Sequence, residues 1–193
     1  MRTLFLYRHS LTSANARRLY CGKCDLPLSG PGRELAERVR ASAPPPRCDL
    51  TVSSGLKRAT ETLFLLTGEE ASITIPDLQE MDFGRFDMHG YEELKADADY
   101  LAWISDTSGE YRCPGGESVK RFRERVLSGA AALLELPWES ALVVCHGGSI
   151  VHMMQAWFPK EPHGFYDWQP AACGGWRIVF EGEQPLSFGA LQG

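Results

Sequence analysis

The sequence has no long apolar run and no basic tract. Its 193 residues carry a formal net charge of −5, which argues against a nucleic-acid partner because phosphate backbones attract basic surfaces. No segment approaches the roughly 20 apolar residues that a membrane-spanning helix needs, and the apolar stretch after Met1 is shorter than the core of a signal peptide. We therefore expect no nucleic-acid partner, no membrane association and a cytoplasmic location.

Patterns that would hold a metal or a cofactor are also missing. The chain has six cysteines, at positions 21, 24, 48, 113, 145 and 173. Cys21 and Cys24 have the spacing of a metal-binding or redox pair, but no second close pair completes a zinc set. We therefore expect no metal and no cofactor, and reduced thiols in a chain without an export signal.

Apolar segments of strand length alternate with longer segments of helical character. The expected strands cover residues 3–7, 50–53, 72–75, 142–145, 176–181 and 186–188. The expected helices cover residues 12–18, 32–40, 56–66, 91–104, 118–136 and 149–157. This alternation predicts an α/β fold, a three-layer sandwich with a mainly parallel central sheet flanked by helices. We expect a single domain over residues 1–193, with a helical cap around residues 85–113.

An Arg–His pair follows the first expected strand. In open α/β sheets, ligands bind beyond the carboxyl ends of the strands, which is where Arg8 and His9 are placed. A guanidinium offers planar, bidentate donors to an oxyanion, and an imidazole beside it suits attack on phosphorus. Asn15 adds a polar side chain shortly afterwards. An Arg–His pair is by itself more often structural, so its interpretation depends on the segments that follow.

Two further expected strands lead to hydrogen-bond donors. Arg58 stands in the first turn of a helix, where the helix dipole disfavours a cation unless an anion binds between them. The alternative is a solvated arginine beside Lys57. His146 and Gly147 follow the strand at 142–145, and glycine lets backbone N–H groups approach an anion. A buried structural histidine before a tight turn is the alternative there.

Two carboxylates lie between these segments. Glu80 and Asp82 alternate with apolar residues before Gly84, so both would point the same way along an extended chain. One carboxyl beside a phosphoryl site can protonate a leaving alkoxide and later accept a proton from water. Two ordinary surface acids are the alternative. Taken together, the four segments describe a pocket for a dianionic phosphate with a nucleophilic imidazole.

In this order, the four segments resemble the histidine phosphatase superfamily, the phosphoglycerate mutase-like proteins. The resemblance extends from Leu4 to about Trp176, and residues 114–118 are similar to the small phosphatase branch that contains the α-ribazole phosphatases. It implies that His9 becomes phosphohistidine and that Glu80 is the general acid and base. The implied phosphate-binding residues are Arg8, Arg58, His146 and Asn15, and the implied substrate loop holds Cys21 and Gly22. The backbone at Gly147 is a further predicted contact.

The resemblance implies a metal-independent phosphatase of small phosphomonoesters, such as α-ribazole 5′-phosphate or sugar phosphates. Three alternatives stay open. Mutase-type phosphoryl transfer is disfavoured because Met81 stands where the mutases carry arginine and their basic insertion is missing. A protein phosphohistidine phosphatase needs a more open site than the aromatic segment 91–112 indicates. A phospholigand-binding module without catalysis is suggested by Ser10, where the family usually has glycine.

Aromatic residues in two segments are candidate walls of the substrate site. Segment 91–112 contains Tyr91, Tyr100, Trp103 and Tyr111, and segment 160–168 contains a histidine and further aromatic residues. At helical spacing, aromatic side chains more often pack against the protein than contact a ligand. We expect a small-molecule phosphate ester as the partner, and a homodimer is compatible with the sequence.

Overall fold

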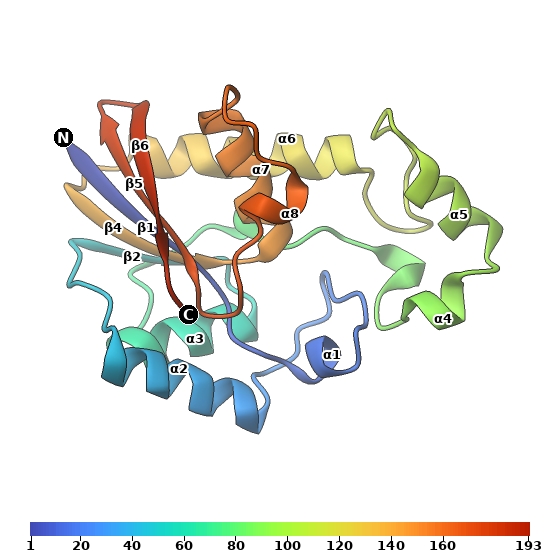
Figure 1. The fold of residues 1–193 in the computed structure, drawn as a ribbon, viewed down its shortest axis with the longest axis horizontal. Coiled ribbons are helices and arrows are strands. Elements are labelled where there is room, and N and C mark those ends of the chain that lie inside the picture. Colours follow the sequence, from blue (N-terminus) through green and yellow to red (C-terminus); the bar gives the residue numbers. More distant parts are fainter.

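A six-stranded sheet forms the middle layer of the computed structural model, which describes residues 1–193 (Figure 1). The strands are β1 (Arg2–Arg8), β2 (Leu50–Ser53), β3 (Ile73–Thr74), β4 (Ser140–Cys145), β5 (Gly175–Glu181) and β6 (Gln184–Leu191). Their order is β3-β2-β4-β1-β5-β6. The first four run parallel, and β5 and β6 join antiparallel beside β1. The predicted α/β fold with a mainly parallel sheet is confirmed.

Helices cover both faces of the sheet (Figure 1). α2 (Gly30–Ser42) and α3 (Lys57–Thr67) lie on one face, and α6 (Val119–Glu135) and α7 (Gly147–Trp157) lie on the other. The shorter helices are α1 (Ser13–Ala16), α4 (Tyr91–Leu94), α5 (Ala98–Ser105), α8 (Phe165–Trp168) and the 3₁₀ helices η1 (Pro76–Leu78) and η2 (Gly84–Phe86). None of these helices combines the length and the apolar character needed to cross a membrane.

Alternation along the central strands divides the core into two clusters, one on each face of the sheet. On β4, Val143 packs with the cluster that includes α6 and α7, whereas Leu142 and Val144 pack with the cluster that includes α2 and α3. On β1, Leu6 and Tyr7 are divided in the same way. Because helices cover both faces, these strands are apolar at nearly every position, which explains the continuous apolar runs in the sequence.

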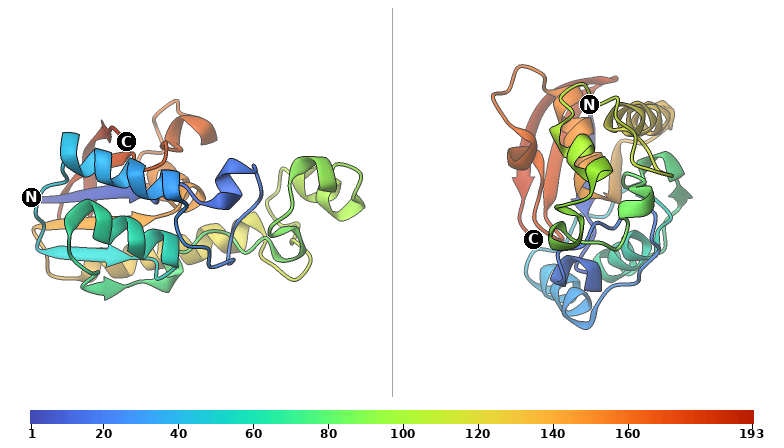
Figure 2. Two further views of the ribbon diagram at one scale, coloured as in Figure 1. Left: turned by 90° about the horizontal axis from the view of Figure 1, so that it is seen from below. Right: turned by 90° about the vertical axis from the view of Figure 1, so that its right-hand side faces the viewer.

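The segment around residues 85–113 projects beyond the end of the sheet at which β1 and β4 finish (Figure 2). Here α4 and α5 replace the single helix predicted over residues 91–104. The carboxylate of Asp97 accepts a hydrogen bond from the backbone N–H of Tyr100 at 3.0 Å and thereby begins α5. The prediction of one helix is wrong because this local cap outweighs the helical periodicity.

The base of the projecting segment is closed by contacts between two turns. Gly84 has a φ of +54°, which favours glycine, and its Cα faces the backbone of Pro114 and Gly116. The backbone N–H of Arg85 donates to the carbonyl of Pro114 at 2.8 Å. The two ends of the segment are therefore held together, backbone against backbone.

Candidate active site

The predicted site residues meet where the parallel strands end. His9 follows β1 directly, and His146 follows β4, its hydrogen-bonded neighbour. Their rings lie with centroids 5.1 Å apart. Arg58 reaches the same place from the first turn of α3, and its side chain is fully buried. Parallel strands present their carboxyl ends at one edge, which is why segments far apart in the sequence converge here.

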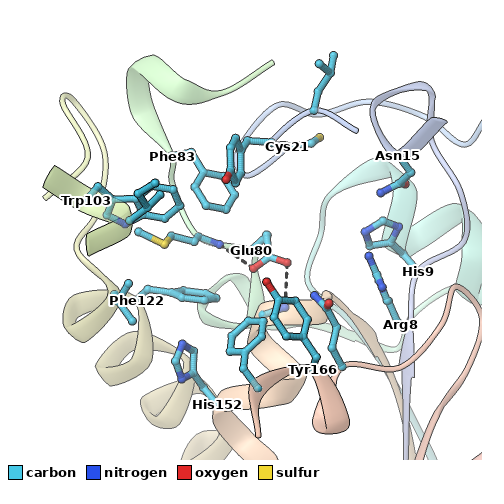
Figure 3. A pocket seen from close by; sticks show the side chains of 18 of the residues that line it. Arg8, His9, Asn15, Cys21, Glu80, Phe83, Trp103, Phe122, His152 and Tyr166 are labelled. Atoms are coloured by element: carbon cyan, nitrogen blue, oxygen red, sulfur yellow. Dashed lines mark hydrogen bonds between the residues drawn. The ribbon is translucent and has the colours of Figure 1, made fainter. Parts of the chain in front are cut away.

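A cavity of about 560 Å³ opens at this edge and has two chemically different ends. Six of the predicted residues line it: Arg8, His9, Asn15, Cys21, Arg58 and Glu80. Figure 3 shows Arg8, His9 and Asn15 on one side, with Phe83, Trp103, Phe122 and His152 on the opposite side and Glu80 between them. The cavity therefore has a polar end beside His9 and an aromatic end beneath the projecting segment.

Three predicted residues lie outside the cavity wall. His146 is buried directly behind it, in contact with the ring of His9. Gly22 directs its N–H to the carboxylate of Asp87 at 2.6 Å, and Gly147 lies beside the side chain of Gln169. The structure thus places His146 against the ring of His9, behind the cavity wall, and the two glycines in supporting positions.

The imidazole of His9 is held as a neutral base. Its Nδ1 lies 2.6 Å from the carbonyl oxygen of Ser10, to which it can only donate. The Nε2 lone pair is therefore free for attack on a ligand in the cavity. Burial, followed by the nearby guanidinium of Arg58, lowers the pKa of His9 from 6.5 to about 3. The backbone carbonyl of Ser10 therefore sets this tautomer.

The second imidazole is also buried and neutral, and its tautomer is set by Ser54. Nε2 of His146 lies 2.8 Å from the hydroxyl of Ser54, and Nδ1 is enclosed without a hydrogen-bond partner. Burial and the charge of Arg58 lower the pKa of His146 well below 6.5. When the Ser54 hydroxyl donates to Nε2, the single ring proton stays on Nδ1. Sequence reasoning did not assign a role to Ser54, although it stands at a strand end.

The two arginines are held by backbone carbonyl groups. Arg8 donates through Nη1 to the carbonyl of Pro170 at 2.8 Å. Arg58 donates through its two Nη atoms to the carbonyls of Cys24 at 2.8 Å and Gly22 at 2.7 Å. Nε of each arginine is buried without a partner. Two guanidinium N–H groups are thus unpaired donors beside His9, and Nδ1 of His146 is a third when Ser54 donates to Nε2; such a set suits an oxyanion.

Glu80 reaches the cavity from an extended segment after η1. One carboxylate oxygen accepts from the backbone N–H of Met81 and the other from that of Gly148, each at 3.1 Å. Gly148 has no side chain, and a Cβ there would meet the carboxylate of Glu80 and the ring of Phe122. The position therefore requires glycine for this close approach.

Asp82 does not share the direction of Glu80. Its carboxylate pairs with Lys23 at 3.2 Å and accepts the N–H of Gly84 at 3.0 Å. The expectation that both acids point the same way is wrong, because this segment is not a regular strand. Only Glu80 lines the cavity.

Arg125, which the sequence did not single out, holds the Glu80 segment in place. Its guanidinium donates to the backbone carbonyls of Asp77, Gln79 and Glu80 at 2.8, 3.1 and 3.1 Å. It also forms two 2.8 Å hydrogen bonds with the carboxylate of Glu117. Although burial alone would raise the pKa of Glu117, these bonds lower it. Arg125 therefore fixes the backbone that presents the Glu80 carboxyl.

Ser10 occupies the position where the resembling family usually has glycine, and its backbone is unstrained. The residues other than glycine with positive φ are Arg18, Met88 and Cys173, so Ser10 lies in an ordinary region. Its hydroxyl donates to the carbonyl of Gly32 at 2.6 Å, and its N–H donates to Thr62 at 2.9 Å. The side chain is directed into the protein, which removes the reason to suspect an impaired site.

The loop at residues 21–24 wraps around Arg58. The structure joins Cys21 and Cys24, whose Cα atoms are 5.7 Å apart, as a disulfide. The expectation of reduced thiols is wrong for this pair and holds for the other four cysteines, which are free. The turn around the guanidinium brings the two cysteines together.

The aromatic end of the cavity combines residues from six segments. It is lined by Tyr20, Phe83, Trp103, Phe122, His152, Phe165 and Tyr166. Of the aromatic residues expected in segment 91–112, only Trp103 reaches the cavity, while Tyr100 packs in the core. Most of this wall could not be predicted, because its members come together only when the projecting segment meets α6, α7 and α8.

Comparisons with known proteins agree with this geometry. The profile of the histidine phosphatase superfamily (branch 1) matches residues 4–187. The chain is 34% identical to the adenosylcobalamin/α-ribazole phosphatase of Escherichia coli (strain K12) over 151 residues, which cover 75% of this chain and 73% of that protein. Among solved structures, the α-ribazole phosphatase from Shigella flexneri is similar, with a TM-score of 0.87, 26% identity and coverage of 99% and 96% of the two chains. A phosphoglycerate mutase from Thermus thermophilus gives a TM-score of 0.73 at 28% identity, with 98% and 99% covered.

Replacing Arg125 by methionine is expected to destabilise the protein. The change removes the partner of the buried Glu117 carboxylate and three carbonyl contacts, which costs on the order of 3 kcal/mol in the free energy of unfolding. Urea denaturation measures this loss. Arg123→Met, an exposed arginine of the same helix, serves as the matched control. Adding Glu117→Gln to Arg125→Met should restore part of the stability, and equal losses for Arg123→Met and Arg125→Met would contradict the assignment.

The buried histidines predict a loss of stability in mild acid. The pKa values of His9 and His152 are lowered to about 3 and about 4, so the unfolded chain binds these protons at higher pH than the folded protein does. The free energy of unfolding is therefore highest above pH 6.5. It declines by about 1.4 kcal/mol per pH unit for each histidine as the pH falls toward 4. Thermal unfolding between pH 7.5 and pH 5 tests this. His152→Leu should show a shallower decline, and an unchanged slope would contradict the prediction.

Proposed function

Because this chain belongs to the histidine phosphatase superfamily (branch 1) and is a phosphoric monoester hydrolase, we propose that it hydrolyses small phosphomonoesters of ring-bearing alcohols through a phosphohistidine on His9. The observation that carries this proposal is the set of unpaired donors around a neutral imidazole. Nε of Arg8, Nε of Arg58 and Nδ1 of His146 are buried without partners beside His9. Phosphoryl oxygens are the acceptors that this set lacks.

In the first step, Nε2 of His9 attacks phosphorus and the bond from phosphorus to the ester oxygen breaks. Glu80, in its protonated form, gives its proton to the leaving oxygen, so the alcohol departs neutral. Charge on the transferring group is spread over three oxygens, and the guanidinium groups of Arg8 and Arg58 stabilise it. The N–H of His146 and the amide of Asn15 are further proposed donors to these oxygens.

In the second step, water replaces the alcohol. Glu80, now a carboxylate, removes a proton from the water as its oxygen attacks phosphorus, and the phosphorus–nitrogen bond to His9 breaks. Inorganic phosphate leaves, and both residues return to their starting states. The positive charge in this scheme comes from Arg8 and Arg58, so we propose a reaction that needs no metal. The cytoplasmic location and the homodimer remain predictions of the sequence.

The aromatic end of the cavity supports a neutral, ring-bearing leaving group. Trp103, Phe83 and Phe122 offer apolar surfaces there, and Asp106 is the charged residue at that end of the wall. A second phosphate or carboxylate on the substrate would find no cation beyond the two arginines beside His9. α-Ribazole 5′-phosphate, which the name of a similar solved phosphatase contains, is a ribose phosphate that carries a benzimidazole ring and has these properties.

Mutase-type transfer receives less support from the same wall. Met81, at the position where the mutases carry arginine, is 3% exposed and belongs to the hydrophobic core. No cation takes its place at the aromatic end of the cavity. Water is therefore the proposed acceptor of the phosphoryl group.

His9→Ala tests the proposed nucleophile. Phosphate release from α-ribazole 5′-phosphate should fall by roughly 10³-fold or more, because the covalent route is lost. Rapid acid quenching of the parent protein with ³²P-labelled substrate should trap an acid-labile phosphoenzyme that the variant lacks. His89→Ala, which replaces an exposed histidine outside the cavity, is the control. Release at the parental rate by His9→Ala would overturn the mechanism.

A substrate panel in EDTA tests the leaving-group preference and the metal independence together. We expect kcat/KM for α-ribazole 5′-phosphate to exceed that for glucose 6-phosphate and 3-phosphoglycerate, and EDTA to leave the rates unchanged. Trp103→Ala should lower kcat/KM for α-ribazole 5′-phosphate, relative to the other two substrates, by roughly tenfold, the size of one aromatic contact. A highest kcat/KM for 3-phosphoglycerate, or loss of activity in EDTA, would contradict the proposal.

A further inference from the structure

His152 is a polar residue among the aromatic side chains of the far wall of the cavity. It lies on α7, one helical turn after Gly148, and only 6% of its surface is exposed. The imidazole meets the ring of Phe122 edge to face, with centroids 5.1 Å apart (Figure 3). A buried imidazole in such surroundings is costly unless a hydrogen bond satisfies it.

The ring of His152 has no hydrogen-bond partner for Nδ1. This nitrogen is enclosed by the protein and makes no hydrogen bond. Burial, with a smaller effect of the Arg123 charge, lowers the pKa of His152 to about 4, so the ring is neutral near pH 7. Since His152 lines the cavity, Nε2 is the ring nitrogen left to a ligand. A proton on Nε2 avoids a buried, unpaired N–H at Nδ1.

His152 and Glu80 both line the cavity and are linked through Gly148 and Phe122. Side chains in a helix lean toward its N-terminus, so the imidazole extends back over the turn that contains Gly148. The N–H of Gly148 is bonded to the Glu80 carboxylate at 3.1 Å, and the ring of Phe122 approaches the same glycine. The ring of Phe122 therefore contacts both the imidazole and the turn of α7 whose N–H binds the Glu80 carboxylate.

This arrangement places His152 near the leaving alcohol, on the side of the ester oxygen away from phosphorus. Glu80 is the proposed donor to that oxygen, and the rest of the alcohol extends toward Phe122 and Trp103. A hydroxyl or ring nitrogen a few bonds beyond the ester oxygen would reach Nε2. A neutral imidazole has no charge with which to attract a second anionic group, so its partner is an uncharged polar atom.

We propose that His152 is a specificity-determining residue that donates a hydrogen bond from Nε2 to an uncharged hydroxyl or ring nitrogen of the leaving alcohol. This inference deepens the proposed function and rests on it for the direction in which the substrate lies. It divides the recognition of the substrate into two parts. Phe122 and Trp103 accept any flat ring, whereas His152 distinguishes alcohols that carry a suitably placed acceptor.

The test compares two substrates that differ in this acceptor. α-Ribazole 5′-phosphate has ribose hydroxyls and a ring nitrogen, whereas phenyl phosphate has an aromatic ring and no further polar atom. His152→Leu should lower kcat/KM for α-ribazole 5′-phosphate by roughly three- to tenfold, mainly through KM, because one hydrogen bond is lost. The value for phenyl phosphate should stay within about twofold of the parent protein.

Two further variants separate recognition from packing. His152→Gln keeps an N–H donor and should recover part of the loss with α-ribazole 5′-phosphate, while His89→Leu, outside the cavity, should behave as the parent protein. Equal losses with both substrates would show that His152 only supports the structure and would overturn the proposal. Hydrolysis of α-ribazole 5′-phosphate by His152→Leu at the parental kcat/KM would overturn it as well.

Binding of the dephosphorylated nucleoside separates this inference from the proposed reaction. Calorimetric titration of the parent protein with α-ribazole measures recognition of the leaving group without any chemistry. Binding that is weakened in His152→Leu supports the role of His152 even if no phosphate is released from any ester. The role of His152 is overturned if the parent protein and His152→Leu bind the nucleoside equally well. Phosphate release from both esters would then leave the proposed function intact.

Discussion

The rest of the structure depends on one constraint: guanidinium groups and other N–H donors are buried where the parallel strands end. A guanidinium removed from water is costly unless oxygen atoms surround it. Arg58 meets this need with carbonyls from the loop at residues 21–24, and Arg8 with the carbonyl of Pro170. These loops are therefore shaped around the arginines. The N–H groups that stay unpaired are the ones that we propose for phosphate binding.

The cavity is divided between two parts of the fold. Its polar end is made where strands end, so the positions of His9 and His146 follow from the sheet itself. Its aromatic end is made by the projecting segment together with α6, α7 and α8. Glu80 stands between them, tied to α7 through Gly148 and to α6 through Arg125. The proposed reaction chemistry and the proposed recognition of the leaving group thus rest on separate elements, with Glu80 between them.

Sequence patterns predicted the residues that follow strands and failed where partners are remote. The carboxyl ends of strands are recognisable from apolar runs, which is how Arg8 and His146 were found. Arg125 contacts carbonyls more than 40 positions away, and nothing in its own helix distinguishes it from the exposed Arg123. Alternation wrongly paired Asp82 with Glu80, because the segment between η1 and η2 is irregular.

The sequence by itself determined the layered α/β fold and the set of donors, because strand length, apolar alternation and helix caps are local properties of the chain. It also determined the negative charge and the lack of long apolar segments. Only the tertiary structure decided which donors lack partners, which carboxyl faces the cavity and which aromatic residues form its far wall. Those properties depend on distances between segments such as 80 and 148 or 122 and 152, and no local pattern encodes them.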